Sequence, residues 1–136
     1  MKPWITVETT VKANIEKVWK YWNEPEHITH WDFASDDWCA PRAENDLRVG
    51  GKLKVRMEAK DGTAGFDLEA EYTAVEEHKR IEFAMGDRHV KVEFTDMGDS
   101  CKITESFEAE DVNSLDKQRA GWQAILDNFK KYTEAN

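Results

Sequence analysis

The stretch GKLKVRMEAKDGTAGFDLEAEYTAVEEHKRIEFAMGDRHVKVEFTDMGDSCKITESFE, residues 51–108, decides the fold of this chain. Apolar and polar side chains alternate along most of it, and this period of two predicts strands with one buried face. Gly or Asp occupies the intervening turns, except at Glu77-His78. We predict five strands in an antiparallel meander, at residues 52–59, 65–75, 80–85, 89–95 and 101–108.

The charges of these strands predict how neighbouring strands pair. When the chain is folded back about Asp61-Gly62 and about Gly86-Asp87, opposite charges face each other across the two hairpins. The pairs are Arg56 with Asp67, Lys54 with Glu69, Lys52 with Glu71, Glu82 with Lys91, and Arg80 with Glu93. A slip by one residue would bury all of these charges, so the pattern predicts this register and marks the solvent face.

The opposite face of the predicted sheet is apolar and needs a cover, which the C-terminal segment provides. An amphipathic stripe of roughly 20 residues predicts a helix there, with Asn113 as its expected N-cap. The apolar positions of the stripe are Leu115, Trp122, Ile125, Leu126, Phe129 and Tyr132. Gly121 lies inside this helix, and we expect it to allow close approach to the sheet or to leave space for a ligand. One long helix laid across a curved antiparallel sheet is a two-layer α+β fold.

The N-terminal part adds a strand and two short helices. Residues 5–11 alternate, which predicts a half-buried strand. A helix follows, with Asn14 as the expected N-cap and with Trp19 and Trp22 as expected core residues. A second short helix is expected at about residues 24–31.

Residues 32–50 show no regular period, and we expect them to form the longest loop-rich region of the chain. The region carries Phe33 and Trp38. Aromatic side chains in a long loop indicate that the loop folds back over an apolar part of the molecule. Gly50-Gly51 is expected to form a bend or bulge at the entry to the next strand.

The composition limits the classes of partner. The 136 residues most simply form one domain, residues 1–136, with a formal net charge of −9 from 19 Lys and Arg against 28 Asp and Glu. An acidic chain lacks the positive surface that nucleic acids and anionic membranes require. No apolar run reaches the length of a membrane-spanning helix, and residues 1–8 do not resemble a signal peptide. Cys39 and Cys101 have no metal-ligand spacing, so we expect two reduced thiols and a cytoplasmic location.

Several short stretches, taken in their order, carry a resemblance to a known family. They are Ile15-Glu16-Lys17-Val18-Trp19, Pro25-Glu26, Trp31, Leu47-Arg48-Val49-Gly50-Gly51, Asp61-Gly62, Glu71-Tyr72 and GWQAILDNFK at residues 121–130. The chain thereby resembles the START-like (SRPBCC) superfamily and, more narrowly, the bacterial homologues of the activator of heat shock protein 90 ATPase. The resemblance covers essentially the whole chain. It implies a helix-grip fold, in which a curved antiparallel sheet wraps around a long C-terminal helix.

The same resemblance leaves the function open. The superfamily hosts lipid carriers, hormone receptors, cyclases and co-chaperone domains, so its motifs indicate a fold more than an activity. It implies a cavity between the sheet and the helix, because a strongly bent sheet gripped by one helix rarely fills solidly. A small apolar ligand and a chaperone are therefore both expected as classes of partner.

Glu105 is the most informative polar residue of the predicted sheet. Alternation places it on the apolar face, between Ile103 and Phe107. A carboxylate that is buried without a partner is costly and tends to take up a proton. Two interpretations stay open. Glu105 lies near a pocket mouth or pairs with a tyrosine hydroxyl or a buried water, or it is the polar anchor or acid–base group of an apolar cavity.

We therefore expect binding of a small apolar or amphipathic molecule between the sheet and the C-terminal helix. The expected walls of the cavity are Met57, Phe66, Phe83, Phe94 and Trp122, and Trp31, Phe33 and Trp38 are expected to close its mouth. Glu105 would orient a polar group of the ligand. Two alternatives are a protein-interaction module that stimulates a chaperone ATPase, and a cyclase- or hydrolase-like enzyme that uses Glu105. No second catalytic group is evident, so the sequence favours binding over catalysis.

A metal site is the remaining possibility for the polar residues. His27 and His30 are three residues apart, and Asp32 follows closely. Metal sites need three or four convergent ligands, and no further His lies close in the sequence. No nucleotide-binding or nucleophile motif is present. We expect no metal and no cofactor.

Overall fold

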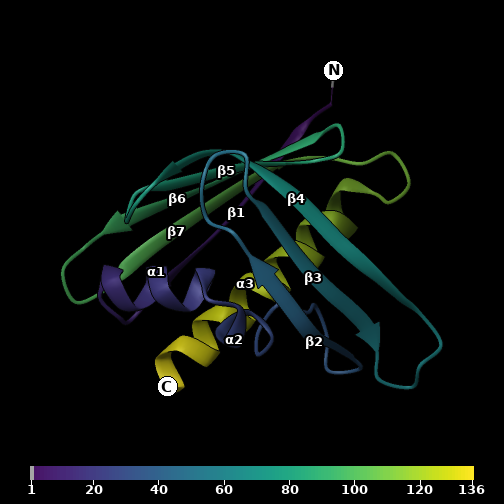
Figure 1. Cartoon of the computed structure of the whole chain (residues 1–136), viewed down its shortest axis with the longest axis horizontal. Helices are drawn as coiled ribbons and strands as arrows, with labels where there is room; N and C mark the ends of the chain where they lie inside the picture. The colour runs from purple at the N-terminus through teal and green to yellow at the C-terminus, as the bar shows by residue number, and fades with distance from the viewer. Residues whose placement is uncertain (1) are drawn as a thin grey trace.

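The computed structural model describes residues 2–136 and consists of one curled antiparallel sheet and three helices (Figure 1). The strands are β1 (Trp4–Val11), β2 (Trp38–Asn45), β3 (Lys52–Ala59), β4 (Gly65–Glu76), β5 (Arg80–Met85), β6 (Arg88–Asp96) and β7 (Cys101–Glu108). The helices are α1 (Ile15–Asn23), α2 (Pro25–Ile28) and α3 (Leu115–Ala135). Within the sheet the order is β1-β7-β6-β5-β4-β3-β2, so the first strand pairs with the last. This is the α+β helix-grip fold that the sequence predicts.

The meander from β3 to β7 confirms the predicted strands and their register. All five predicted pairs of opposite charge are register partners across the β3–β4 and β5–β6 hairpins. Two of them also form ion pairs, Lys54 with Glu69 at 3.7 Å and Arg56 with Asp67 at 3.6 Å. The charged face of the sheet is therefore its solvent face, as expected.

Strand β2 was not predicted, because its residues lie in the region 32–50 that we expected to be irregular. The strand forms the edge of the sheet and pairs only with β3. Its register shifts between Cys39 and Arg42, which makes room for Pro41 at a bulge on the edge strand. Pairing with a regular neighbour thus creates a strand where the local sequence shows no alternation.

Side-chain N-caps satisfy backbone N–H groups at the N-termini of α1 and α3. Asn14 caps α1 as predicted, because its Oδ1 accepts a hydrogen bond from the Lys17 backbone N–H at 2.9 Å. The predicted cap of α3 was wrong by one residue: Ser114 accepts from the Lys117 N–H at 3.1 Å, while the Asn113 side chain donates to Glu110. Helix α2 ends at Ile28, before the predicted boundary.

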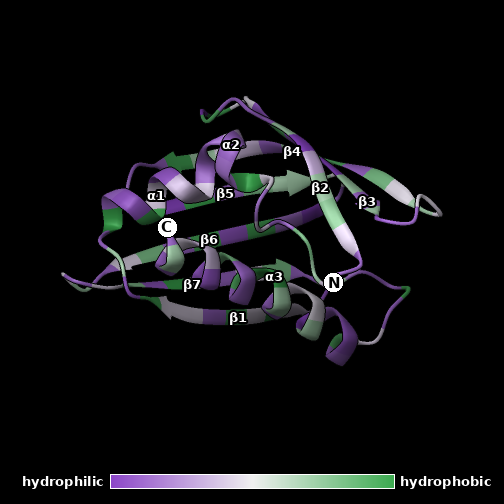
Figure 2. Cartoon of the chain, turned by 90° about the horizontal axis from the view of Figure 1, so that it is seen from below, coloured by the Kyte–Doolittle hydropathy of each residue, from purple (hydrophilic) through white to green (hydrophobic). Residues whose placement is uncertain are grey.

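The core lies between the inner face of the sheet and the helices. Helix α3 runs along β1, and α1 lies over β6 (Figure 2). The largest fully buried side chains come from both layers and include Ile5, Ile81, Ile103, Phe107, Leu126 and Phe129. Cys39 and Cys101 are free thiols. Within residues 2–136, no helix is both long and apolar enough to cross a membrane.

Gly121 does not mark a close approach between α3 and the sheet, contrary to one of our two expectations. A Cβ atom built at this position meets no other atom within 4 Å. Because Gly in a helix interior is about 1 kcal/mol less favourable than Ala, we expect Gly121→Ala to raise the free energy of unfolding by roughly 0.5–1 kcal/mol. Urea denaturation followed by circular dichroism measures this change.

Gly51→Ala is the matched control for this substitution. A Cβ atom at Gly51 would collide with the Asp46 carbonyl oxygen. We therefore expect the same Gly-to-Ala change to destabilise the protein at Gly51. A loss of stability in Gly121→Ala would show that α3 has less room at this position than the structure indicates.

Candidate functional site

A cavity of about 440 Å³ lies between the inner face of the sheet and the helices. Strands β3, β4 and β5 contribute most of its wall, and α1, α2 and α3 close the other side. Its apolar lining consists of Trp22, Ile28, Trp31, Leu53, Met57, Phe66, Leu68, Ile81, Phe83, Met85, Trp122 and Ile125. Phe66 belongs to this lining and is 49% exposed, so the cavity reaches the surface beside β4. Cavities of this size and lining accommodate small organic molecules.

The structure brings together six of the nine side chains that the sequence proposed for the site. These six, Trp31, Met57, Phe66, Phe83, Glu105 and Trp122, all border the cavity. They come from β3, β4, β5, β7, α3 and the segment after α2. Four of these six lie on strands, where alternation identified their inward face, out of twelve residues that the strands contribute to the wall.

Phe94 does not line the cavity, which corrects the expectation that it forms part of the wall, and Phe33 and Trp38 are not among the lining residues either. Phe94 packs instead under α1, where its ring makes an edge contact with Trp19 at 5.2 Å between ring centroids. The Phe33 carbonyl accepts a hydrogen bond from Asn128 of α3 at 2.6 Å. This bond holds the segment after α2 against α3. Trp38 begins β2, and its ring lies 6.0 Å from that of Phe66, beside the mouth.

Trp22 is the aromatic wall residue that the sequence assigned to the core. Its ring lies 4.9 Å from that of Trp31 and 4.9 Å from that of Phe129. One side of the indole thus packs on the core, and the residue also lines the cavity. The helical period of the sequence predicts only which face of α1 is buried. Because that face contacts both the core and the cavity, the period could not assign Trp22 to the cavity.

Glu105 points inward from β7, as alternation predicted, and is only 7% exposed. Its neighbours in the sheet are Val7 of β1 and Val92 of β6, both buried and apolar. Within residues 2–136, no side chain donates a hydrogen bond to its carboxyl group. Burial, together with the charge of Asp32, raises the pKa of Glu105 to about 8.

Asp32 is the second carboxyl group of the cavity, and the sequence did not assign it to this site. It follows α2, and its backbone N–H donates to the Ile28 carbonyl at 3.1 Å. Its side chain keeps some exposed surface because it borders the cavity, but protein atoms surround it on the other sides. This burial raises the pKa of Asp32 to about 7. Asp32 and Glu105 are 73 positions apart in a chain numbered 1–136, so no local motif links them.

The other buried polar groups beside the cavity have partners within the protein. The Tyr72 hydroxyl donates to Asn45 Oδ1 at 2.6 Å, and Asn45 Nδ2 donates to the Asn23 carbonyl at 2.7 Å. Asn23 Nδ2 in turn donates to the Trp19 carbonyl at 2.9 Å. This chain of hydrogen bonds joins β4 to β2 and α1. It leaves the two carboxyl groups as the buried polar groups that face the cavity without such a partner.

The charged residues at the rim have partners too, although only the acidic ones form ion pairs. Arg88 Nε donates to the Glu108 carbonyl at 3.1 Å. Asp67 and Glu69 border the cavity at β4, and they form the ion pairs with Arg56 and Lys54 described above. Among the residues that line the cavity, Arg88 is the sole cationic side chain against four acidic ones.

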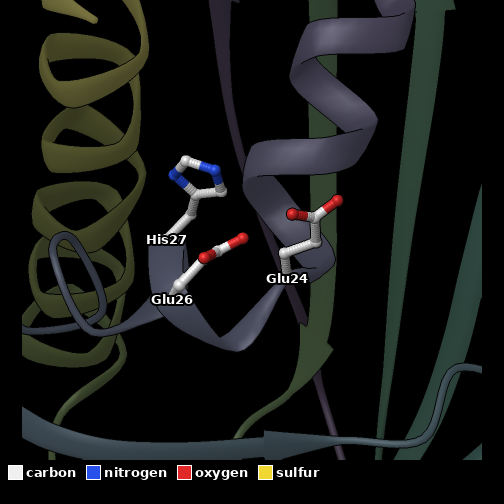
Figure 3. A group of neighbouring side chains, drawn as sticks. All are labelled: Glu24, Glu26 and His27. Atoms are coloured by element: carbon white, nitrogen blue, oxygen red, sulfur yellow. The ribbon is translucent and has the colours of Figure 1, made fainter.

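A surface cluster of Glu24, Glu26 and His27 is the group in residues 2–136 whose arrangement comes nearest to a metal site (Figure 3). Their ligand atoms lie within 4.8 Å of one another. His27 Nδ1 already contacts the Tyr132 hydroxyl at 2.7 Å, and the His27 ring stacks on Tyr21. The cluster does not include Asp32, so the grouping of His27, His30 and Asp32 considered in the sequence is not formed. Exposed acidic groups of this kind are common without a metal, and these contacts alone assign none.

The curled sheet, the gripping helix and the cavity between them define a protein of the START-like, helix-grip class. The family model described as "Activator of Hsp90 ATPase homolog 1-like protein" matches residues 12–134. The chain therefore belongs to this family. No curated protein sequence matches the chain.

Solved structures agree with this assignment. The solution structure of the AHSA1-like protein from Aeromonas hydrophila is 43% identical, with a TM-score of 0.91 over 98% of this chain and 93% of that one. A protein from Cytophaga hutchinsonii is 52% identical, with a TM-score of 0.83 over 97% of this chain and 92% of that one. A protein from Chromobacterium violaceum is 18% identical but has a TM-score of 0.87, covering 98% of this chain and 99% of that one, and so shares the fold.

Proposed function

We propose that this protein binds a small, largely apolar molecule in the cavity between the sheet and α3. The observation that carries the proposal is the apolar cavity of about 440 Å³, which reaches the surface at Phe66. An apolar molecule that enters it removes its own surface and the cavity wall from water, at about 25 cal/mol per Å². The two carboxyl groups of the protein can contact one polar group of a ligand. An amphipathic molecule therefore fits the site better than a pure hydrocarbon.

Trp122→Ala is expected to weaken binding of the uncharged dye Nile red by about tenfold or more, because it removes a large part of the wall. Trp122 stacks on Phe107 at 3.9 Å between ring centroids, and its indole also borders the cavity. Dye fluorescence titrations of the purified protein measure the affinity.

Trp4→Ala is the matched control, because Trp4 is 52% exposed and does not line the cavity. It should leave the dye affinity unchanged. Phe83→Ala, in β5, offers a second wall variant in case Trp122→Ala unfolds. Equal affinity of the wild type and both wall variants would refute binding in this cavity.

A catalytic function is the second candidate, and Asp32 is the observation that favours it. The sequence offered Glu105 without a second acid–base group, whereas the structure places Asp32 at the same cavity. Two carboxyl groups with pKa values of about 7 and about 8 can exchange protons with a bound molecule near neutral pH. Glu105→Gln separates the two functions, since it would abolish turnover of a substrate but keep the binding of Nile red.

Activation of a chaperone ATPase is a third candidate, and the name of the family supports it. It requires contact through the protein surface and no ligand in the cavity. Absence of both binding and ATPase stimulation with the cognate heat shock protein 90 would discard this function.

A further inference from the structure

We propose that the cavity selects an organic ammonium ion, with the cationic group beside Asp32 and Glu105 and the apolar body against the aromatic wall. This inference rests on the proposed function, since it names the chemical class of molecule that the cavity takes. The other polar groups that line the cavity have hydrogen-bond or ion-pair partners. Glu105 is buried, borders the cavity and has no hydrogen-bond partner within residues 2–136.

Within residues 2–136, no cationic side chain is paired with either carboxyl group. Arg88 of β6 is engaged with the Glu108 carbonyl, and the Tyr72 hydroxyl of β4 donates to Asn45. The residues that β3, β5, α1, α2 and α3 present to the cavity are uncharged. Asp67 and Glu69 of β4 only add negative charge at the rim. A cationic ligand can therefore supply the partner that residues 2–136 do not give these two carboxyl groups.

An ammonium group is the polar group that best complements carboxyl groups lining a cavity. Each N–H can donate a charge-assisted hydrogen bond to a carboxylate oxygen, and such bonds are about twice as strong as neutral ones. The bound cation also lowers the cost of ionising these carboxyl groups in an apolar cavity. A ligand carboxylate would meet like charge or compete for the same proton, and a hydroxyl group would gain only neutral hydrogen bonds.

The aromatic lining favours a cation for an independent reason. The rings of Trp22, Trp31, Phe83 and Trp122 all border the cavity. The face of an aromatic ring attracts a cation, most strongly for Trp and where water is excluded. The wall that binds the apolar body can therefore also contact the cationic end.

Three probes with the same eight-carbon tail test the inference: octylamine, octanol and octanoate. Calorimetric titration at pH 7.5 should show octylamine binding about tenfold or more tightly than octanol, and octanoate most weakly. The preference for octylamine should grow between pH 6 and pH 8. Over this range Asp32 ionises and Glu105 begins to ionise in the free protein, whereas an alkylamine stays charged.

Asp32→Asn and Glu105→Gln, singly and together, should remove the preference for octylamine while octanol still binds. Glu71→Gln is the matched control, because Glu71 lies exposed on β4 opposite Lys52 and does not line the cavity, and it should retain the preference. If one of the two single variants unfolds, the other still measures the preference.

Equal affinity for octylamine and octanol would overturn this inference, and so would a preference that survives in the double variant. In both cases the binding of octanol would still support an apolar cavity. If none of the three probes nor Nile red binds, the proposed function itself fails, which is a distinguishable result.

Discussion

The free energy of unfolding should fall as the pH rises from 5 to 9, and Glu105→Gln should remove most of this fall. In the folded protein the pKa of Glu105 is raised from 4.5 to about 8. In the unfolded chain the same carboxyl group ionises near its ordinary pKa. Between these values the folded state binds more protons than the unfolded state, so stability is lost as the pH rises.

The size of this effect follows from the raised pKa. A change from 4.5 to about 8 corresponds to on the order of 5 kcal/mol, and relaxation of the cavity will reduce it. Asp32, whose pKa is raised to about 7, adds a contribution of the same sign over a lower pH range. Paired carboxyl groups such as Asp87 and Glu134 have lowered pKa values. They stabilise the folded protein when ionised, and this stabilisation is lost only in more acidic solution.

Urea denaturation at unit steps from pH 5 to pH 9 measures this dependence in the wild type and in Glu105→Gln. Glu71→Gln is the matched control, because Glu71 lies exposed on β4 opposite Lys52. This control should keep the wild-type pH profile. A wild-type profile that is flat over the range, or a Glu105→Gln profile as steep as that of the wild type, would contradict the burial of an unpartnered carboxyl group.

Phe129→Ala should lower the free energy of unfolding by about 3 to 5 kcal/mol, the usual cost of deleting a fully buried aromatic ring. The Phe129 side chain is completely buried. Its ring makes edge contacts with Trp22 and Trp31, both at 4.9 Å between ring centroids. Because these two indoles line the cavity, the substitution should also weaken Nile red binding without touching the dye directly.

Phe66→Ala is the internal comparison for this substitution, because Phe66 is 49% exposed at the mouth of the cavity. The same change should cost less than about 1 kcal/mol there. Urea midpoints of the two variants, measured side by side, give the difference. Similar midpoints would show that α3 packs less tightly on the tryptophans than the structure indicates.

The sheet was predictable because two independent patterns in the sequence agree. Alternation identifies the strands from β3 to β7, and charges of opposite sign identify their register. The pair of Arg80 with Glu93 illustrates this, because alternation places both residues on the solvent face, their opposite charges predict that they face each other, and they are register partners. The inward position of Glu105 follows from the same period of two.

The parts that the sequence did not reveal depend on contacts between distant segments. Strand β2 forms because β3 offers its edge, and Pro41 hides the strand from any test based on alternation. Asp32 reaches the cavity because α2 ends at Ile28 and the chain then turns inward. His78 occupies a left-handed turn, with φ of 64°, where the other hairpin turns have Gly. No local period or motif marks these positions.

The pairing of β1 with β7 has a consequence for how the protein is made. Thr6 lies opposite Ser106, so about 100 residues separate the partners. The ribosome releases β1 long before β7 exists, whereas β3 to β7 can pair in succession as local hairpins. Helix α3, which runs along β1, emerges later still. We therefore expect the nascent chain to form its hairpins first and to enclose the cavity only after synthesis of the C-terminal helix.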